Sequence, residues 1–202
     1  MKGEKMSFAS AFEIGIWNAW ILQLIFYLSM FIPNIFLSKE AKEKSKRMSQ
    51  FPPVKKKVKI LAVSTHVVIM PVALIYSIFL PLRLGTGWLY AGLILYAVSL
   101  IISLMTLFNI ASGSAEKPVT GGAYKFSRHP MYFSGFLMFI SVGIACASWV
   151  FLLLGVIWIV FWQMVVPTEE ILLIEKYGDS YREYRDRTPR WIGIPKSPAT
   201  SS

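Results

Sequence analysis

Four stretches of this chain run for more than 20 residues without one Asp, Glu, Lys or Arg side chain, and no other feature restricts its fold more. A helix that crosses a bilayer needs about 20 mostly apolar residues. Only 16% of the residues are charged, whereas about a quarter are charged in an ordinary soluble domain. We therefore predict an all-α, polytopic membrane protein and not a soluble protein with a large core.

Three of the stretches each predict one membrane-spanning helix, over residues 12–37, 60–82 and 88–108. Proline interrupts two of them, because it removes a backbone donor and clashes with the preceding turn. Pro33 is predicted to bend or end the first helix, Pro71 interrupts the second, and Pro81 stops it.

The fourth stretch, Met131 to Val166, is too long for one span. A break near Cys146-Ala147-Ser148 divides it into a tight helical hairpin, which brings the total to five spans. From Pro167 onward the chain is charged and amphipathic, so we predict a cytoplasmic helical tail that does not cross again. Residues 196–202 are predicted to be disordered, and the whole chain, 1–202, is predicted to form a single membrane domain.

Basic side chains fix the expected orientation, since cytoplasmic loops of membrane proteins are enriched in Lys and Arg. Eighteen of the 21 lie in segments 38–59, 109–130 and 176–196, which five spans bring to one face. We predict that this face is cytoplasmic and the N-terminus outside, in what is expected to be a prokaryotic cell membrane. The eighteen are Lys39, Lys42, Lys44, Lys46, Arg47, Lys55, Lys56, Lys57, Lys59, Lys117, Lys125, Arg128, Lys176, Arg182, Arg185, Arg187, Arg190 and Lys196; Lys2, Lys5 and Arg83 remain opposite.

The composition also excludes several functions. The net charge of +10 is explained by topology and anionic headgroups, so no nucleic-acid partner is expected. One cysteine, Cys146, and two histidines are too few for a zinc site, and no metal is expected. Lys2 and Lys5 precede an apolar segment too long for a signal peptide. Only Glu13 and His66 are ionisable within the spans, which argues against an ion-coupled carrier.

Polar and turn-forming residues gather in two places, the loop Asn109–Tyr132 and the segment that runs from Glu169-Glu170 to Pro189-Arg190. A hairpin returns its two ends to the same place, so both clusters are expected to meet on one face. Each piece taken alone has a plain structural explanation: Arg128-His129-Pro130 suits a helix start, and Glu169-Glu170 suits the first turn of a helix after Pro167. Gly121-Gly122 suits a turn, and Tyr181 and Tyr184 suit membrane-surface anchors.

Together, however, the residues Val119 to Tyr124, Arg128 to Tyr132, Glu169 to Leu173, Tyr177 to Tyr184 and Pro189-Arg190 form a pattern that resembles the isoprenylcysteine carboxyl methyltransferase family. The resemblance covers about 109–195, and the first three spans, 1–108, match only in being apolar. It implies a short, five-span member in which 109–195 form the cofactor-binding methyltransferase region. Such a protein methylates the C-terminal carboxylate of a prenylated cysteine, in a protein, peptide or small molecule, with S-adenosylmethionine as donor.

The resemblance also implies the residues that hold the cofactor. Glu116, Lys117, Pro118 and Val119 would line it and Tyr124 would pack on it; His129, Pro130, Met131 and Tyr132 would wrap it; Glu169 would bind its polar groups, with Asn109 and Glu170 as further contributors. No catalytic residue is assigned, because a carboxylate is already ionised at neutral pH and direct transfer needs no general base. Two departures stand out: Val165 occupies the position of a substrate-binding arginine, and only Val119 keeps the usual character of its loop.

Three other functions stay open at this point. A methyltransferase of a phospholipid amine or another lipid would need a base to deprotonate the acceptor, for which Glu170 or His129 is a candidate. A sterol-reductase-like protein with a nicotinamide cofactor would normally need more spans. A non-enzymatic scaffold or lipid-binding protein would not bind S-adenosylmethionine.

Overall fold

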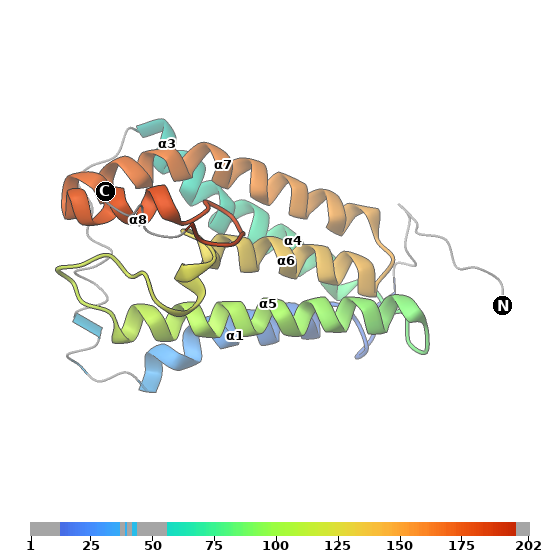
Figure 1. The fold of residues 1–202 in the computed structure, drawn as a ribbon. Helices are drawn as coiled ribbons and strands as arrows, with labels where there is room; N and C mark the ends of the chain where they lie inside the picture. The colour runs from blue at the N-terminus through green and yellow to red at the C-terminus, as the bar shows by residue number, and fades with distance from the viewer. Residues whose placement is uncertain (1–12, 37–38, 40–41, 44–55, 197–202) are drawn as a thin grey trace.

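The computed structural model describes residues 13–36, 39, 42–43 and 56–196. Its described part is helical and contains no strand beyond one isolated bridge between Asn18 and Pro81, which confirms the all-α prediction. Figure 1 shows the long helices lying side by side along one direction. They are α1 Trp20–Phe36, α3 Lys56–Ser64, η1 Thr65–Ile69, α4 Met70–Ile78, α5 Gly87–Ser112, α6 Pro130–Ala145, α7 Trp149–Tyr177 and α8 Asp179–Arg187, with the short 3-10 helix η2 Gly122–Lys125.

The first helix begins later than its apolar run, at Trp20 and not near residue 12. The preceding backbone is not helical and pairs with the chain that leaves α4: the Ala19 amide donates to the Leu80 carbonyl at 2.8 Å. The Asn18 side-chain amide also donates to the Ile78 carbonyl, at 2.7 Å. These bonds satisfy backbone groups that a helix would otherwise have satisfied. Pro33 does not end α1, which continues to Phe36.

The second apolar segment is one rod built from three pieces, α3, η1 and α4. Its middle turn is π-helical, from Thr65 to Ile69, and Pro71 follows at the start of α4. Proline cannot donate to the turn before it, and a π turn is one way in which a helix accommodates such a break. The expected interruption at Pro71 is therefore present, and the rod ends at Ile78, before Pro81.

Helix α5 packs most extensively against α6, through a stripe of small and hydroxylated residues. A Cβ on Gly92 would lie 2.6 Å from the Ala145 Cβ, so the two backbones approach closely there. Further along, the Ser99 hydroxyl donates to the Ser134 carbonyl at 2.8 Å. Small residues and hydroxyls of this kind hold helices together where lipid removes the hydrophobic driving force.

Helices α6 and α7 are separated only by Cys146-Ala147-Ser148, where the helix break was expected. Pro167 does not end α7, which continues to Tyr177, so the plain explanation of Glu169-Glu170 as the first turn of a new helix does not apply. Glu169 and Glu170 accordingly lie inside a long helix and not in a first turn. The charged tail then forms α8 after Gly178.

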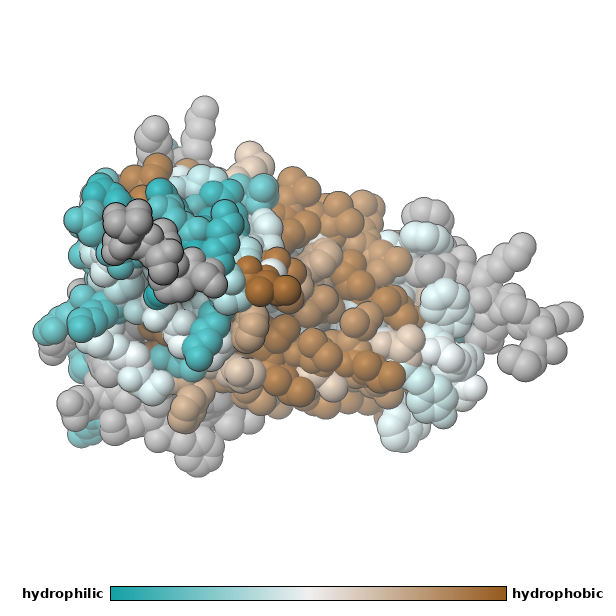
Figure 2. Space-filling model, viewed as in Figure 1, coloured by the Kyte–Doolittle hydropathy of each residue, from teal (hydrophilic) through white to brown (hydrophobic). Residues whose placement is uncertain are grey.

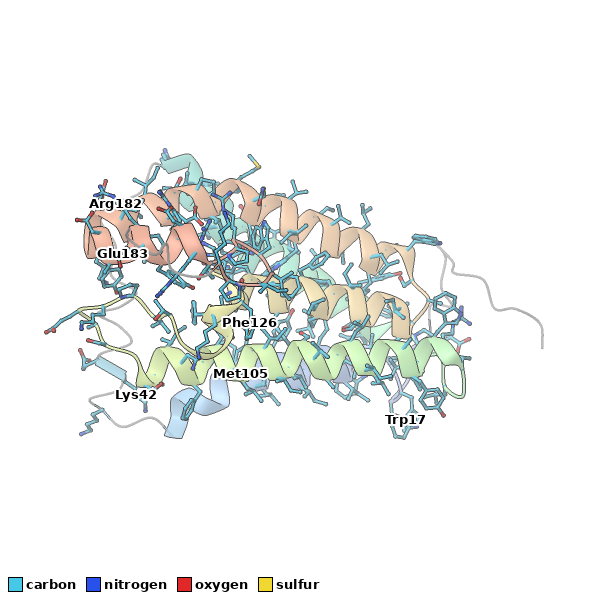
Figure 3. The ribbon with its side chains drawn as sticks, viewed as in Figure 1. Trp17, Lys42, Met105, Phe126, Arg182 and Glu183 are labelled. Atoms are coloured by element: carbon cyan, nitrogen blue, oxygen red, sulfur yellow. The ribbon has the colours of Figure 1, made fainter. Side chains whose placement is uncertain are left out.

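The surface divides into an apolar middle and a polar end (Figure 2). Lys42, Arg182 and Glu183 lie at the end of the bundle that is opposite Trp17 (Figure 3). Three helical segments are long and apolar enough to cross a membrane, Ile60–Ile78, Gly87–Ser112 and Trp149–Tyr177, and Trp20–Phe31 and Pro130–Ala145 are shorter apolar helices. The chain is therefore a helical membrane protein, while the count of five spans stays a prediction. The basic residues Lys2, Lys5, Lys44, Lys46, Arg47 and Lys55 and the tail 197–202 lie outside the described residues.

Candidate functional site

A cavity of about 300 Å³ lies among residues at the polar end of the bundle. It is lined by the end of α5, the loop that follows, the start of α6, the last turns of α7, and α8. Ligand pockets in proteins commonly measure about 300–1,000 Å³, so this one suits a small molecule. Its lining residues are Ile110, Pro118, Val119, Tyr124, Arg128, His129, Pro130, Met131, Tyr132, Glu169, Leu173, Tyr177, Tyr181 and Tyr184.

The loop on one side of the cavity is attached to α5 through Asn109. Its side-chain oxygen accepts a hydrogen bond from the Ala123 amide at 3.2 Å. Gly122 passes directly over this side chain with a φ of +56°, and a Cβ there would lie 2.2 Å from the Asn109 oxygen. Both the backbone conformation and the close approach require glycine. Asn109 thus shapes the loop that carries Pro118 and Val119 and does not itself line the cavity.

Across the cavity, Glu169 faces the start of α6. The Tyr132 hydroxyl donates to its Oε1 at 2.6 Å, and the Tyr132 ring stacks on Trp162 with 3.6 Å between ring centroids. The Trp158 indole donates to the Tyr132 carbonyl at 3.0 Å, which fixes this residue further. The other Glu169 oxygen, Oε2, lies 3.7 Å from His129 Nδ1, too far for a hydrogen bond. Glu169 therefore keeps an oxygen with which to accept a ligand's hydrogen bond.

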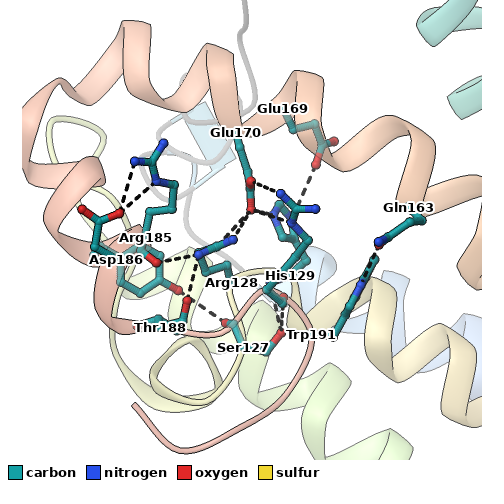
Figure 4. A network of polar contacts seen from close by, with 12 residues as sticks. Ser127, Arg128, His129, Gln163, Glu169, Glu170, Arg185, Asp186, Thr188 and Trp191 are labelled. Atoms are coloured by element: carbon teal, nitrogen blue, oxygen red, sulfur yellow. Dashed lines mark hydrogen bonds and ion pairs between the residues drawn. The ribbon is translucent and has the colours of Figure 1, made fainter. Parts of the chain in front are cut away.

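Its neighbour Glu170 is different, because it is buried and surrounded by donors (Figure 4). Arg128 contacts Oε1 at 2.8 Å and Arg190 contacts Oε2 at 2.7 Å. His129 Nε2 lies 3.3 Å from Oε1 as well. Two guanidinium groups and an imidazole thus take up both oxygens of Glu170, which binds neighbouring side chains and does not line the cavity.

The segment after α8 completes the same network. Arg128 donates through Nη1 to the carbonyls of Arg185, at 2.5 Å, and Thr188, at 2.9 Å. Its backbone amide donates to the Pro189 carbonyl at 3.0 Å. Arg128 therefore connects three parts of the chain: the loop before α6, the end of α7 and the segment after α8. Because of these bonds, the C-terminal segment packs beside the cavity.

Three tyrosines from the loop and α8 form the remaining wall. The Tyr184 hydroxyl donates to the Tyr124 carbonyl at 2.7 Å. Burial raises the pKa of Tyr124, Tyr181 and Tyr184 above the usual value, so all three phenols are neutral. The Tyr181 hydroxyl is buried and has no hydrogen-bond partner among the described residues. A buried hydroxyl without a partner costs free energy, so Tyr181 lines the cavity at some expense to the stability of the fold.

Eight of the twelve residues expected from the resemblance line this one cavity: Pro118, Val119, Tyr124, His129, Pro130, Met131, Tyr132 and Glu169. Asn109 and Glu170 do not line it but bind the loop and the arginines beside it. Glu116 and Lys117 are exposed in the loop and do not line it either. The lining residues absent from that set are Ile110, Arg128, Leu173, Tyr177, Tyr181 and Tyr184. Helical spacing could have identified two of them, Leu173 and Tyr177. They follow Glu169 at intervals of four residues along α7 and therefore lie on the same face of the helix.

Comparison with known proteins finds sequences similar to part of this chain. Residues 86–180 match the model of the phospholipid methyltransferase family. The chain is 32% identical over 117 residues to a protein-S-isoprenylcysteine O-methyltransferase of Schizosaccharomyces pombe, a match that covers 55% of this chain and 48% of the relative. It is 33% identical over 88 residues to a protein of the same name from Dictyostelium discoideum, covering 38% and 32%. The chain thus spans at most about half the length of these relatives.

Proposed function

We propose that this chain is a membrane methyltransferase that uses S-adenosylmethionine. Its residues 86–180 match the model of the phospholipid methyltransferase family, and the proposal proceeds from that match. One observation carries the proposal. Side chains from α5, the following loop, α6, α7 and α8, many of them expected from the family resemblance, converge on a single cavity at the polar end of an apolar bundle.

The cavity suits the chemistry of that cofactor. S-adenosylmethionine carries an ammonium group, ribose hydroxyls and a positively charged sulfonium. Glu169 Oε2, which lies 3.7 Å from His129 Nδ1, is placed to accept hydrogen bonds from such donors. Aromatic rings attract cations, and Tyr124 and Tyr184 are among the aromatic residues that line the cavity. When bound, the cofactor supplies an electrophilic methyl group, and the residues of this chain bind it, orient it and exclude water.

For the acceptor we favour the carboxylate of a prenylated cysteine, the substrate that the names of both relatives indicate. An ionised carboxylate would take the methyl group that the bound cofactor supplies, with the cofactor's sulfur as the leaving group, and no residue of this chain would need to move a proton. Catalysis then rests on alignment and on removal of water from the nucleophile. Glu170 fits this reaction as a supporting residue, because Arg128 and Arg190 take up both of its oxygens.

A phospholipid amine is the second candidate acceptor, because the matched family is described by that substrate. An ammonium headgroup must lose a proton before it can accept a methyl group, so this reaction requires a base. Of the two bases considered, Glu170 is committed to its arginines, which leaves His129. The amine reaction therefore has fewer residues available to it than the carboxylate reaction.

We place the cavity on the cytoplasmic face, with five spans and the N-terminus outside. A prenyl chain is soluble in lipid whereas the methyl donor is soluble in water. An enzyme that joins them needs a polar cavity where the apolar surface ends, and the polar end of this bundle meets that need. Membrane lipids and a prenylated cysteine are accordingly the expected partners.

Transfer of radiolabelled methyl from S-adenosylmethionine to N-acetyl-S-farnesylcysteine, by the full chain in lipid nanodiscs, tests the proposal. Methyl ester formation is expected in wild type and a large loss in Glu169→Gln, with Glu175→Gln, an exposed glutamate on the same helix, as the matched control. If the protein binds the cofactor and forms no ester, but transfers the labelled methyl group to phosphatidylethanolamine, the acceptor is the phospholipid amine. Absence of saturable cofactor binding would leave a scaffold or lipid-binding protein.

A further inference from the structure

Three exposed apolar side chains lie on two neighbouring segments near the polar end of the bundle. They are Phe126, in the loop before α6, and Ile192 and Ile194, in the segment after α8. The Gly193 amide donates to the Phe126 carbonyl at 3.0 Å, so the two segments lie side by side. Ile194 is 90% exposed, the largest fraction among the large hydrophobic residues that the structure describes. Exposed apolar side chains that gather in this way can mark an interaction surface.

The contacts of Trp191 place the segment after α8 where the membrane-spanning surface ends. Its indole donates to the Gln163 side-chain oxygen at 2.7 Å. Gln163 lies on α7, whose apolar stretch begins at Trp149. A bilayer core of about 30 Å takes about 20 helical residues, so a span that begins at Trp149 ends near Thr168, and Gln163 lies about 7 Å inside that end. Trp191 therefore reaches the boundary between hydrocarbon and headgroups.

Phe126 lies at a similar depth, by an independent observation. Figure 3 shows it level, along the bundle, with Met105, which is exposed on the membrane-spanning helix α5. Arg182 and Glu183 on α8 lie farther toward the polar end in the same view. The chain therefore turns back after α8, from the polar end toward the apolar surface of the bundle.

The charges beside these apolar side chains are positive. Lys125 adjoins Phe126 and is exposed, and the Lys196 amide donates to the carbonyl of Arg187, another exposed basic residue, at 2.8 Å. Residues 187–196 include three basic side chains and no acidic one. Apolar side chains flanked by basic ones suit a membrane surface, because lipid takes the first and anionic headgroups attract the second. Tryptophan also favours this interface.

We propose that residues 191–194, together with Phe126, dock on the bilayer surface, with Ile192 and Ile194 inserted among the lipid headgroups and the first acyl carbons. This inference goes beyond the proposed function and does not depend on it. The docking segment is also connected to the cavity. Arg190 contacts Glu170 Oε2 at 2.7 Å, and the Trp191 ring lies 6.3 Å from the His129 ring between centroids. The bilayer thus contacts the segment that completes the polar network beside the cavity.

Spin labels on single cysteines test the depth of this segment, because molecular oxygen concentrates in lipid whereas a nickel chelate stays in water. Ile194→Cys is labelled in the full chain, in nanodiscs of phosphatidylcholine and phosphatidylglycerol. Met105→Cys is the matched control for a side chain in lipid and Glu183→Cys for one in water. Cys146 is buried, and Cys146→Ala removes it from the background. The ratio of oxygen to nickel collisions at position 194 is expected to approach that at position 105 and to exceed that at position 183 several-fold.

A ratio at position 194 as low as that at position 183 places the segment in water and overturns the inference. Few collisions with either reagent also overturn it, since the side chain then packs against protein and not against lipid. If the Ile194→Cys protein does not fold, Ile192→Cys repeats the measurement on the same segment. Neither a methyl donor nor an acceptor is present, so every outcome leaves the proposed function to its own test.

Discussion

Replacement of Glu170 by glutamine tests whether the two adjacent glutamates of α7 have separate roles. Glu170 is 5% exposed, and its oxygens contact Arg128, Arg190 and His129. Glutamine keeps the shape of the side chain but removes its negative charge. It also replaces one hydrogen-bond-accepting oxygen by an NH2 group, which can only donate. Arg128 retains the carbonyls of Arg185 and Thr188, so its charge is left solvated by dipoles but without a counter-ion.

Removing one member of a buried ion pair costs about 3–5 kcal/mol. The lower end applies here, because the Arg190 side chain is 33% exposed and water compensates part of its loss. For a protein of this size, each kcal/mol lowers Tm by about 2–4 °C, so Glu170→Gln is expected to lower Tm by roughly 6–12 °C. Glu169→Gln should leave Tm within about 2 °C, since its side chain has one protein hydrogen bond, from Tyr132, that glutamine can still accept.

Thermal unfolding in detergent measures these differences, and titration with S-adenosylmethionine measures binding by the folded protein. Glu175→Gln, an exposed charge on the same helix, is the control for removal of a carboxylate and should change neither quantity. The expected pattern is loss of stability in Glu170→Gln and loss of cofactor binding in Glu169→Gln. A stable Glu170→Gln protein combined with an unstable Glu169→Gln protein would refute the assignment of supporting and ligand-binding roles.

Three further predictions concern the walls of the cavity. Tyr132→Phe removes the hydroxyl that orients the neighbouring glutamate but keeps its stacked ring, so the cofactor Kd should rise by about three- to tenfold in calorimetry with little change in Tm. Gly122→Ala forces a Cβ onto Asn109 at a positive φ and should reduce both Tm and cofactor binding, whereas Gly121→Ala, where a Cβ meets nothing within 4 Å, should affect neither; equal effects of the two would contradict the close approach. Burial raises the pKa of Tyr184, so the stability that comes from its neutral phenol is complete below the unfolded pKa of about 10 and is lost as the pH rises above it; Tyr184→Phe should reduce the fall of Tm between about pH 9 and 11.

The limits of the sequence-based prediction are clearest at the ends of the helices. The apolar run from residue 12 predicts a helix, but the backbone before Trp20 pairs with the chain that follows α4, through the Ala19 amide and the Leu80 carbonyl. Pro167 predicts a helix start, yet α7 continues through it. Hydropathy reports which residues prefer lipid and says nothing about which backbone groups a distant segment will satisfy.

The sequence alone determined that this is a helical membrane protein, because uncharged runs of this length leave no other solution in lipid. It also determined which residues carry polar chemistry, since Tyr124, His129 and Glu169 stand out against an apolar background. Only the tertiary structure decided which of the adjacent Glu169 and Glu170 lines the cavity and which binds the arginines. Successive residues on a helix point about 100° apart, so one carboxylate faces the cavity and the other faces Arg128 and Arg190. That difference depends on what packs around the helix, which no local pattern of residues records.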